Sequence, residues 1–206
     1  MKIYDISMEI SEDVQVYKNK EEKKAKLIQQ YNFQNSSVYE TQLMMNLHTG
    51  THIDAPLHAI ENGLTTETYT LDQFFGPCQV LDFMTVEERI TAKDLEKYTI
   101  EEDTFILLKT KNSLDQEFNY NFIYLDESGA QYLVDKNIKG VGIDGLGIER
   151  NQSGHPTHKI LLGKRIPILE GLRLEGIQAG YYDIAAFPIK IKNVEASPVR
   201  AVLIEK

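Results

Sequence analysis

Four side chains that could bind a metal ion fall within a segment of eleven residues, at His48, His52, Asp54 and His58. Imidazole nitrogen and carboxylate oxygen are the usual ligands of a zinc or manganese ion in hydrolases. A lone histidine is more often a hydrogen-bonded core or surface group. Four candidate ligands in so short a segment reverse that expectation and indicate a metal site.

The spacing of these residues favours a strand with a bend. In an extended strand, His52 and Asp54 point to the same face, roughly 6.6 Å apart. A straight strand would place His48 about 13 Å from His52, so the two can share an ion only if the backbone bends, which Gly50 permits. Gly50, its β-branched neighbours and Pro56 argue against a helix. We therefore predict a kinked strand whose polar edge faces a metal.

A second segment supplies the remaining candidates. The chain has five histidines, and the other two are His155 and His158. Glu170 follows the apolar run 166–169, where an unpaired carboxylate would be costly and a metal ion is one partner that removes the cost. Together the two segments offer enough donors for two ions with bridging carboxylates, the arrangement of metal-assisted hydrolysis.

Composition predicts an ordinary globular protein with one domain over residues 1–206. Hydrophobic residues make up 42% of the chain and charged residues 26%. The net charge of -9 argues against nucleic acid as a partner. Cys78 is the single cysteine, which excludes an internal disulfide, and we expect it to be a buried small residue. No signal peptide or membrane-length apolar run is visible, so we expect a cytoplasmic protein without membrane contact.

The elements that must position these side chains mix strands and helices. A mixed-charge run over 20–26 is typical of a solvated helix face or a loop. Helical patterns fit 91–98, with Thr91 as N-cap and Asp94 in a capping box, together with 127–136 and 156–163. Strand patterns fit 3–7, 38–47, 78–83, 104–110, 141–144, 166–170, 181–191 and 199–204. The prediction is a mixed α/β fold with a curved, mostly β core.

The segment from His48 to His58 resembles the signature of the cyclase family, which includes bacterial kynurenine formamidase and isatin hydrolase. The resemblance extends over nearly the whole chain. Besides the signature it takes in residues 5–7, 76–78, 142–144, 158–172 and 198–202. It implies a swivelling β/β/α fold and a homo-oligomer, often a dimer with pockets near the interface.

The resemblance also assigns metal ligands for two divalent ions per chain. It implies that His48, His52 and Asp54 bind one ion, that Asp54 reaches a second ion completed by His158, and that Glu170 bridges both. Zinc is the expected metal, although such ligands also suit manganese or cobalt. The family pattern does not demand His155, which we expect to be a loop residue at the rim of a pocket.

His58 would then be the proton donor and acceptor beside the reacting carbonyl, and not a primary ligand. The family stacks its aryl substrate on a tryptophan near the N-terminus, but this chain contains no tryptophan. Tyr17 stands in that place, followed by Lys18-Asn19-Lys20 where the family has Pro-Gly-Asp. A second departure follows Asp144, where residues 145–149 lack the serine that the family often shows and end in Glu149. The metal chemistry is therefore expected to carry over, whereas the substrate is not.

These observations predict a metal-dependent hydrolase of an amide C–N bond, similar to an arylformamidase that converts N-formylkynurenine to kynurenine and formate. A metal-bound water, with its pKa lowered towards about 7, would attack the carbonyl carbon, and His58 would carry the proton to the leaving nitrogen. A hydrolase of a cyclic amide or lactone remains an alternative, as does a metal-stabilised binding protein without catalysis. A serine hydrolase is disfavoured because the sequence has no Gly-x-Ser-x-Gly elbow.

Overall fold

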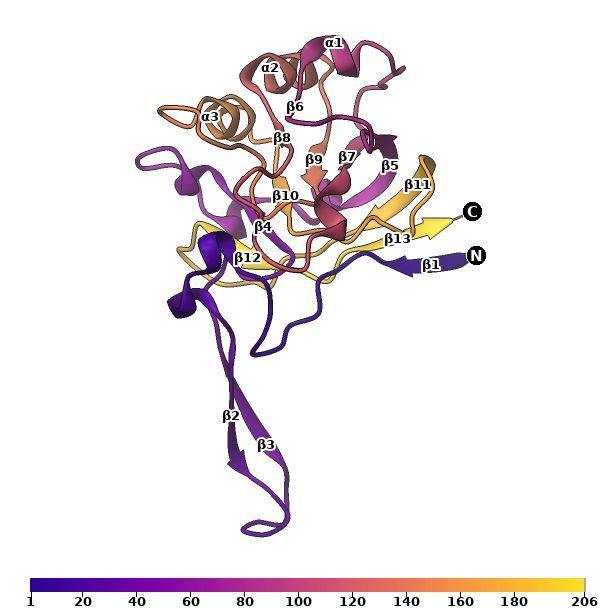
Figure 1. Ribbon diagram of the computed structural model, residues 1–206. Coiled ribbons are helices and arrows are strands. Elements are labelled where there is room, and N and C mark those ends of the chain that lie inside the picture. The colour runs from indigo at the N-terminus through magenta and orange to yellow at the C-terminus, as the bar shows by residue number, and fades with distance from the viewer. Residues whose placement is uncertain (206) are drawn as a thin grey trace.

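A curled nine-stranded mixed sheet dominates the computed structural model, which describes residues 1–205 (Figure 1). The strand order is β1-β13-β11-β5-β7-β9-β10-β4-β12. These strands are β1 (Lys2–Asp5), β4 (His52–Asp54), β5 (Phe75–Asp82), β7 (Phe105–Lys109), β9 (Gly140–Ile143), β10 (Ile168–Glu170), β11 (Gly180–Ala185), β12 (Ala196–Pro198) and β13 (Val202–Glu205). Two short strands, β6 (Arg89–Ile90) and β8 (Tyr124–Leu125), form a separate parallel pair. The expected mixed α/β, β-rich fold of one domain is confirmed.

The centre of the sheet is parallel and buried on both faces. Strands β5, β7, β9 and β10 pair in parallel, and β7 is apolar until its last residue because each of its faces meets a separate core. Phe105 and Leu107 pack into one core, whereas Ile106 and Leu108 pack into the core beneath the helices. Three helices cover that second face: α1 (Ala92–Leu95), α2 (Glu127–Asp135) and α3 (Pro156–Gly163) (Figure 1).

The helices begin where the sequence predicts them. Thr91 and Asp94 form the expected capping box, with the Thr91 backbone N–H donating to Asp94 Oδ2 at 3.1 Å. Asp126 caps α2 by accepting a hydrogen bond from the Gly129 backbone N–H at 2.9 Å. Pro156 opens α3 at the position where a missing N–H costs nothing. Helix α1 ends at Leu95, before the predicted end at residue 98, and α2 ends at Asp135, one residue before its predicted end.

The predicted kinked strand over the histidine segment is wrong in its extent. Only β4 (His52–Asp54) is strand, while His48 lies in the turn before it and His58 ends the 3-10 helix η3 (Pro56–His58). Gly50 has a φ of +71°, which ends any extended conformation upstream of β4. Pro56 cannot donate a sheet hydrogen bond and starts η3 instead.

Other strand predictions were correct in place but not in length. The predicted strand 181–191 ends at Ala185, three residues before Pro188, and the predicted strand 38–47 shrinks to β3 (Glu40–Met44). Strand β3 pairs with β2 (Lys26–Tyr31), which the pattern did not predict because its apolar residues do not alternate. Strand β12 was also missed, since Ala196–Pro198 is too short to show a period.

The β2–β3 hairpin projects from the body of the protein (Figure 1). Every residue of both strands is exposed. Large hydrophobic side chains along it and at its tip are 40–77% exposed: Leu27, Ile28, Tyr31, Phe33, Val38, Tyr39, Leu43 and Met44. An isolated two-stranded hairpin is marginally stable in water. The hairpin therefore carries a group of large apolar side chains that the body of the chain leaves uncovered.

None of the helices formed by residues 1–205 is long and apolar enough to span a bilayer. The longest, α2, has nine residues, against about 20 for a membrane span. The cytoplasmic location stays a prediction.

Candidate active site

Two neighbouring strands bring the main candidate ligands together. Strand β4 pairs antiparallel with β10, and His52 lies directly opposite Glu170 in this register. Because side chains alternate along a strand, Asp54 lies on the same face of β4 as His52. All three side chains are buried, with exposed fractions of 4% or less. The pairing of residues far apart in the sequence thus builds one polar face inside an apolar sheet.

The bend at Gly50 brings His48 back to this face. His48 Nδ1 lies 3.2 Å from His52 Nε2, as the expected bend between them requires. The left-handed φ of Gly50 favours glycine, and a Cβ there would also collide with the end of the Ile10 side chain. The geometric prediction made from the spacing is therefore confirmed, although the segment is a turn and not a strand.

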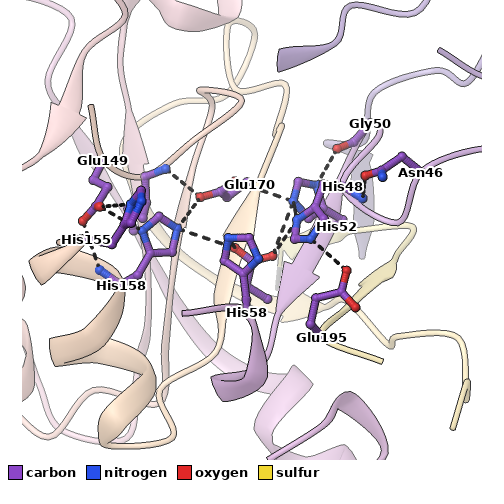
Figure 2. A network of polar contacts seen from close by, with 12 residues as sticks. Asn46, His48, Gly50, His52, His58, Glu149, His155, His158, Glu170 and Glu195 are labelled. Atoms are coloured by element: carbon purple, nitrogen blue, oxygen red, sulfur yellow. Dashed lines mark hydrogen bonds and ion pairs between the residues drawn. The ribbon is translucent and has the colours of Figure 1, made fainter. Parts of the chain in front are cut away.

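The donor atoms fall into two groups that share the carboxylates of Asp54 and Glu170. Figure 2 shows Glu170 between His52 and His158. On one side, Asp54 Oδ1 lies 3.1 Å from His48 Nδ1 and 3.6 Å from His52 Nε2, and Glu170 Oε2 lies 3.6 Å from His52 Nε2. On the other side, His158 Nε2 lies 3.7 Å from Asp54 Oδ2 and 3.5 Å from Glu170 Oε1. Each carboxylate therefore turns one oxygen to each group.

The second ring nitrogen of each of these histidines faces an acceptor. His52 Nδ1 donates to the Gly50 carbonyl oxygen at 2.9 Å, and His48 Nε2 lies 3.3 Å from Glu195 Oε1. His158 Nδ1 lies 3.5 Å from Glu149 Oε1. Such outer partners fix the tautomer of a metal-binding histidine and turn its free nitrogen towards the ion.

Sequence reasoning missed Glu195 altogether and treated Glu149 only as a departure from the family pattern. Glu195 reaches His48 from a segment 147 residues away, next to β12, and no local signal marks it. Glu149 is buried, which is unusual for a glutamate unless it is paired. Its position between His155 and His158 in space could not be read without the fold.

The buried carboxylates of the cluster require positive charge close to them. Asp54 is fully buried and neither of its oxygens accepts a hydrogen bond. Burial would raise its pKa, but the adjacent imidazoles hold the pKa well below its usual range, so the carboxylate is charged. Burial likewise opposes protonation of His158, yet Glu149, Glu170 and Asp54 raise its pKa to about 10. An ionised Asp54 with bare oxygens among imidazole nitrogens is a donor set that fits a divalent cation.

His58 differs from the other histidines of the segment. It stands at the end of η3, its side chain is 33% exposed, and its Nε2 lies 4.0 Å from Asp54 Oδ2. Burial lowers its pKa, as do the nearby rings of His48 and His158, against the opposing charge of Asp54. A neutral imidazole at neutral pH that faces the donor groups can accept a proton.

A cavity of about 270 Å³ opens onto this cluster. His58 and His48 lie on its floor, and Tyr17 and Leu146 form part of its wall. Tyr17 stands in the 3-10 helix η1 (Tyr17–Asn19), packed edge-on against Phe118 with ring centroids 4.8 Å apart. The cavity is of a size that suits a small molecule.

His155 lies at the rim of this cavity, as expected. It precedes α3 in a left-handed conformation with a φ of 54°, and its Nδ1 lies 2.7 Å from Glu149 Oε1. Its side chain is 71% exposed. Glu149 thus lies between an exposed histidine and the buried His158 (Figure 2).

Comparison with known proteins agrees with the sequence resemblance. Residues 4–150 match the family described as "Putative cyclase". The chain is 32% identical to a kynurenine formamidase of Salinibacter ruber over 206 residues, covering 98% of this chain and 97% of the relative. A structure described as "predicted metal-dependent hydrolase from Bacillus stearothermophilus" is 47% identical and superposes with a TM-score of 0.89, covering 98% and 97% of the two chains. An isatin hydrolase shares the fold at 20% identity, with a TM-score of 0.86 over 100% of this chain and 93% of its own. The chain belongs to the cyclase family.

Proposed function

We propose that this protein is a metal-dependent hydrolase of an amide C–N bond, similar to an arylformamidase. The observation that carries the proposal is the division of donor atoms into two groups that share Asp54 and Glu170 beside His58. The similarity to a kynurenine formamidase along nearly the whole of both chains supports the same reaction class.

Two divalent ions, zinc or manganese, fit the two groups. His48, His52 and Asp54 would hold one ion, and His158 with the second oxygen of Asp54 would hold the other, while Glu170 bridges them. Bound there, the ions would supply Lewis acidity, which acidifies a water molecule and polarises a carbonyl group. Gly50, Glu195 and Glu149 would keep the three imidazoles turned towards the ions.

His58 would act as the proton shuttle. Its lowered pKa leaves the ring neutral near pH 7, so Nε2 can take a proton and return it to the leaving nitrogen. The negative charge of the Asp54 carboxylate would stabilise the protonated ring once it forms, since Oδ2 is 4.0 Å away. The half-exposed position of His58 on the cavity floor places it where a substrate would lie.

Tyr17 would provide the aromatic face for the substrate. It lines the cavity, and its packing against Phe118 and Phe122 fixes the ring in place. Burial and the charges of Glu170 and Glu149 raise the pKa of its phenol, which therefore stays neutral. An aryl amide stacked on such a ring gains about 0.5–1.5 kcal/mol beyond simple burial.

We also propose that two copies of this chain form a homodimer through the β2–β3 hairpin. The hairpin exposes eight large hydrophobic side chains on a segment that is marginal by itself. Residues 26–44 carry one lysine and one glutamate, so this segment is neutral in a chain with a net charge of -9 and would not repel a second copy. Light scattering during size exclusion should give twice the chain mass, and a monomer would refute this part of the proposal.

The function is tested by metal loading combined with a substrate panel. Metal-free protein should be inactive on formanilides and regain hydrolysis when zinc or manganese is restored. The panel should include isatin and small lactones, because a cyclic amide or lactone hydrolase would use the same metal centre with a different pocket. Loaded protein that hydrolyses none of these compounds would contradict the proposed reaction class.

A further inference from the structure

One positive side chain stands at the cavity above the candidate metal cluster. Among residues 1–205, Lys23 is the only lysine or arginine that lines the cavity, whose other lining residues include Glu149 and Glu170. A lysine at a pocket wall is often a solvated side chain without a role. Three features distinguish Lys23 from such a solvated lysine: its neighbouring side chains, its fixed backbone and the charge of the site.

The backbone of Lys23 is fixed against the signature segment. It ends the 3-10 helix η2 (Glu21–Lys23), with its N–H donating to the Lys20 carbonyl oxygen at 2.9 Å. The Thr49 hydroxyl, one residue after His48, donates to the carbonyl oxygen of Lys23 at 2.6 Å. The position of Lys23 is therefore tied to the residues that build the metal cluster.

The ammonium group of Lys23 has no carboxylate partner within the described chain. Two neighbouring lysines do have one, since Lys20 lies 3.8 Å from Glu22 and Lys24 lies 3.0 Å from Glu21. Lys23 Nζ instead lies 5.6 Å from the centroid of the Tyr17 ring, on the wall proposed to receive the substrate. An aromatic face and an unpaired ammonium thus adjoin at the same cavity.

The charge of the loaded site favours an anion. Two divalent ions would balance the carboxylates of Asp54, Glu170, Glu149 and Glu195, and Lys23 would then leave the site with one positive charge. The chain as a whole carries -9, so this positive cavity lies in a negative surface. A neutral amide offers an unpaired ammonium only an uncharged acceptor, whereas a carboxylate forms a stronger hydrogen bond in which both partners are ionised.

Resting on the proposed amidase function, we propose that Lys23 binds a carboxylate of the substrate. The substrate class is then an anionic aryl amide whose ring lies on Tyr17 and whose carboxylate lies away from the scissile bond. A single ammonium without a guanidinium partner suits one carboxylate better than a doubly charged phosphate. Lys23 is therefore a specificity-determining residue, while the metal cluster and His58 serve any amide.

Two substrates with the same scissile bond test this inference. Formanilide is neutral, and 3-formamidobenzoate is a formanilide with a ring carboxylate. Wild-type protein should prefer the carboxylated compound, and Lys23→Met should lower the ratio of kcat/KM between the two by about five- to tenfold, chiefly through KM. Lys18→Met is the matched control, because Lys18 Nζ is 5.3 Å from the same Tyr17 ring but does not line the cavity. An unchanged ratio in Lys23→Met, or an equal change in Lys18→Met, would overturn the inference.

Binding separates failure of this inference from failure of the proposed function. Calorimetry on zinc-loaded protein should show that 3-aminobenzoate binds about five- to tenfold more weakly to Lys23→Met than to wild type. If wild type hydrolyses neither amide, the amidase function fails, yet the calorimetric difference still supports Lys23 as the carboxylate site. A dissociation constant that is unchanged by Lys23→Met refutes the carboxylate site whether or not turnover occurs.

Discussion

Glu149 should control how tightly the second ion is held, although it is not assigned as a ligand. Its Oε1 lies 3.5 Å from His158 Nδ1 and its Oε2 accepts a hydrogen bond from the His158 backbone N–H at 3.2 Å. One carboxylate therefore fixes both the ring and the backbone of a proposed ligand. Removing it would free the ring to rotate its Nε2 away from Asp54 and Glu170.

The expected magnitude follows from the number of acceptors. Glu149→Gln preserves the shape of the side chain but leaves it with one acceptor oxygen, whereas Glu149 uses two oxygens to contact His158. Either the ring or the backbone N–H of His158 therefore loses its partner. A buried donor without a partner costs about 1–3 kcal/mol, and loss of such an outer partner typically weakens metal binding about 10- to 100-fold. We expect the affinity of one of the two ions to fall by that factor and the other to change little.

The assay is competition with a chromophoric chelator, which measures the affinity of the tightly bound and the weakly bound ion separately and does not depend on turnover. His155→Ala is the matched control, because it removes the other contact of Glu149, the 2.7 Å pair with His155 Nδ1, and leaves both contacts to His158. It should change the affinity less than threefold. Equal affinities in Glu149→Gln and wild type would refute the reasoning, and loss of an ion in His155→Ala would make His155 a ligand.

Replacing His58, Tyr17 or Asp144 should each change a different property. His58→Ala should keep its metal content and lose about 10²- to 10⁴-fold in kcat, and loss of metal from that variant would make His58 a ligand. Tyr17→Ala should raise KM for an aryl amide about three- to tenfold, with a smaller fall in kcat, whereas Tyr17→Phe should keep the wild-type KM. Equal KM values in wild type and both variants would show that Tyr17 does not contact the substrate. Burial raises the pKa of Asp144 from 3.8 to about 6, so the folded chain holds this proton more tightly than the unfolded chain. The free energy of unfolding should therefore fall by about 2 kcal/mol between pH 4 and pH 6. Denaturant titrations of Asp144→Asn at several pH values should show that this contribution to the pH dependence is lost.

The signature segment shows how far sequence reasoning reaches. Spacing alone required a bend between His48 and His52 and identified Gly50 as its place, and the structure has that bend. It could not tell a turn from a kinked strand, since the residues that surround the bend, such as Ile10 beside Gly50, come from a distant part of the chain. Local chemistry fixes the need for the bend, and tertiary packing fixes its form.

The outer partners of the histidines show where sequence reasoning ends. Glu195 reaches His48 across 147 residues, and Glu149 meets His158 only after the chain has folded around α3. Neither lies at a spacing that marks a ligand set. The helices were easier to predict, since caps such as Thr91 with Asp94 act within one turn. Residues that act on a ligand through space leave no such local pattern.

The number of ions per chain tests the central claim most directly. Asp54 and Glu170 each turn one oxygen to either group of donors, an arrangement that fits two cations side by side. Elemental analysis of protein saturated with zinc and then freed of loose metal should give close to two ions per chain, and Asp54→Asn should lower the content at both positions. One ion or fewer per chain at saturating metal would contradict the account.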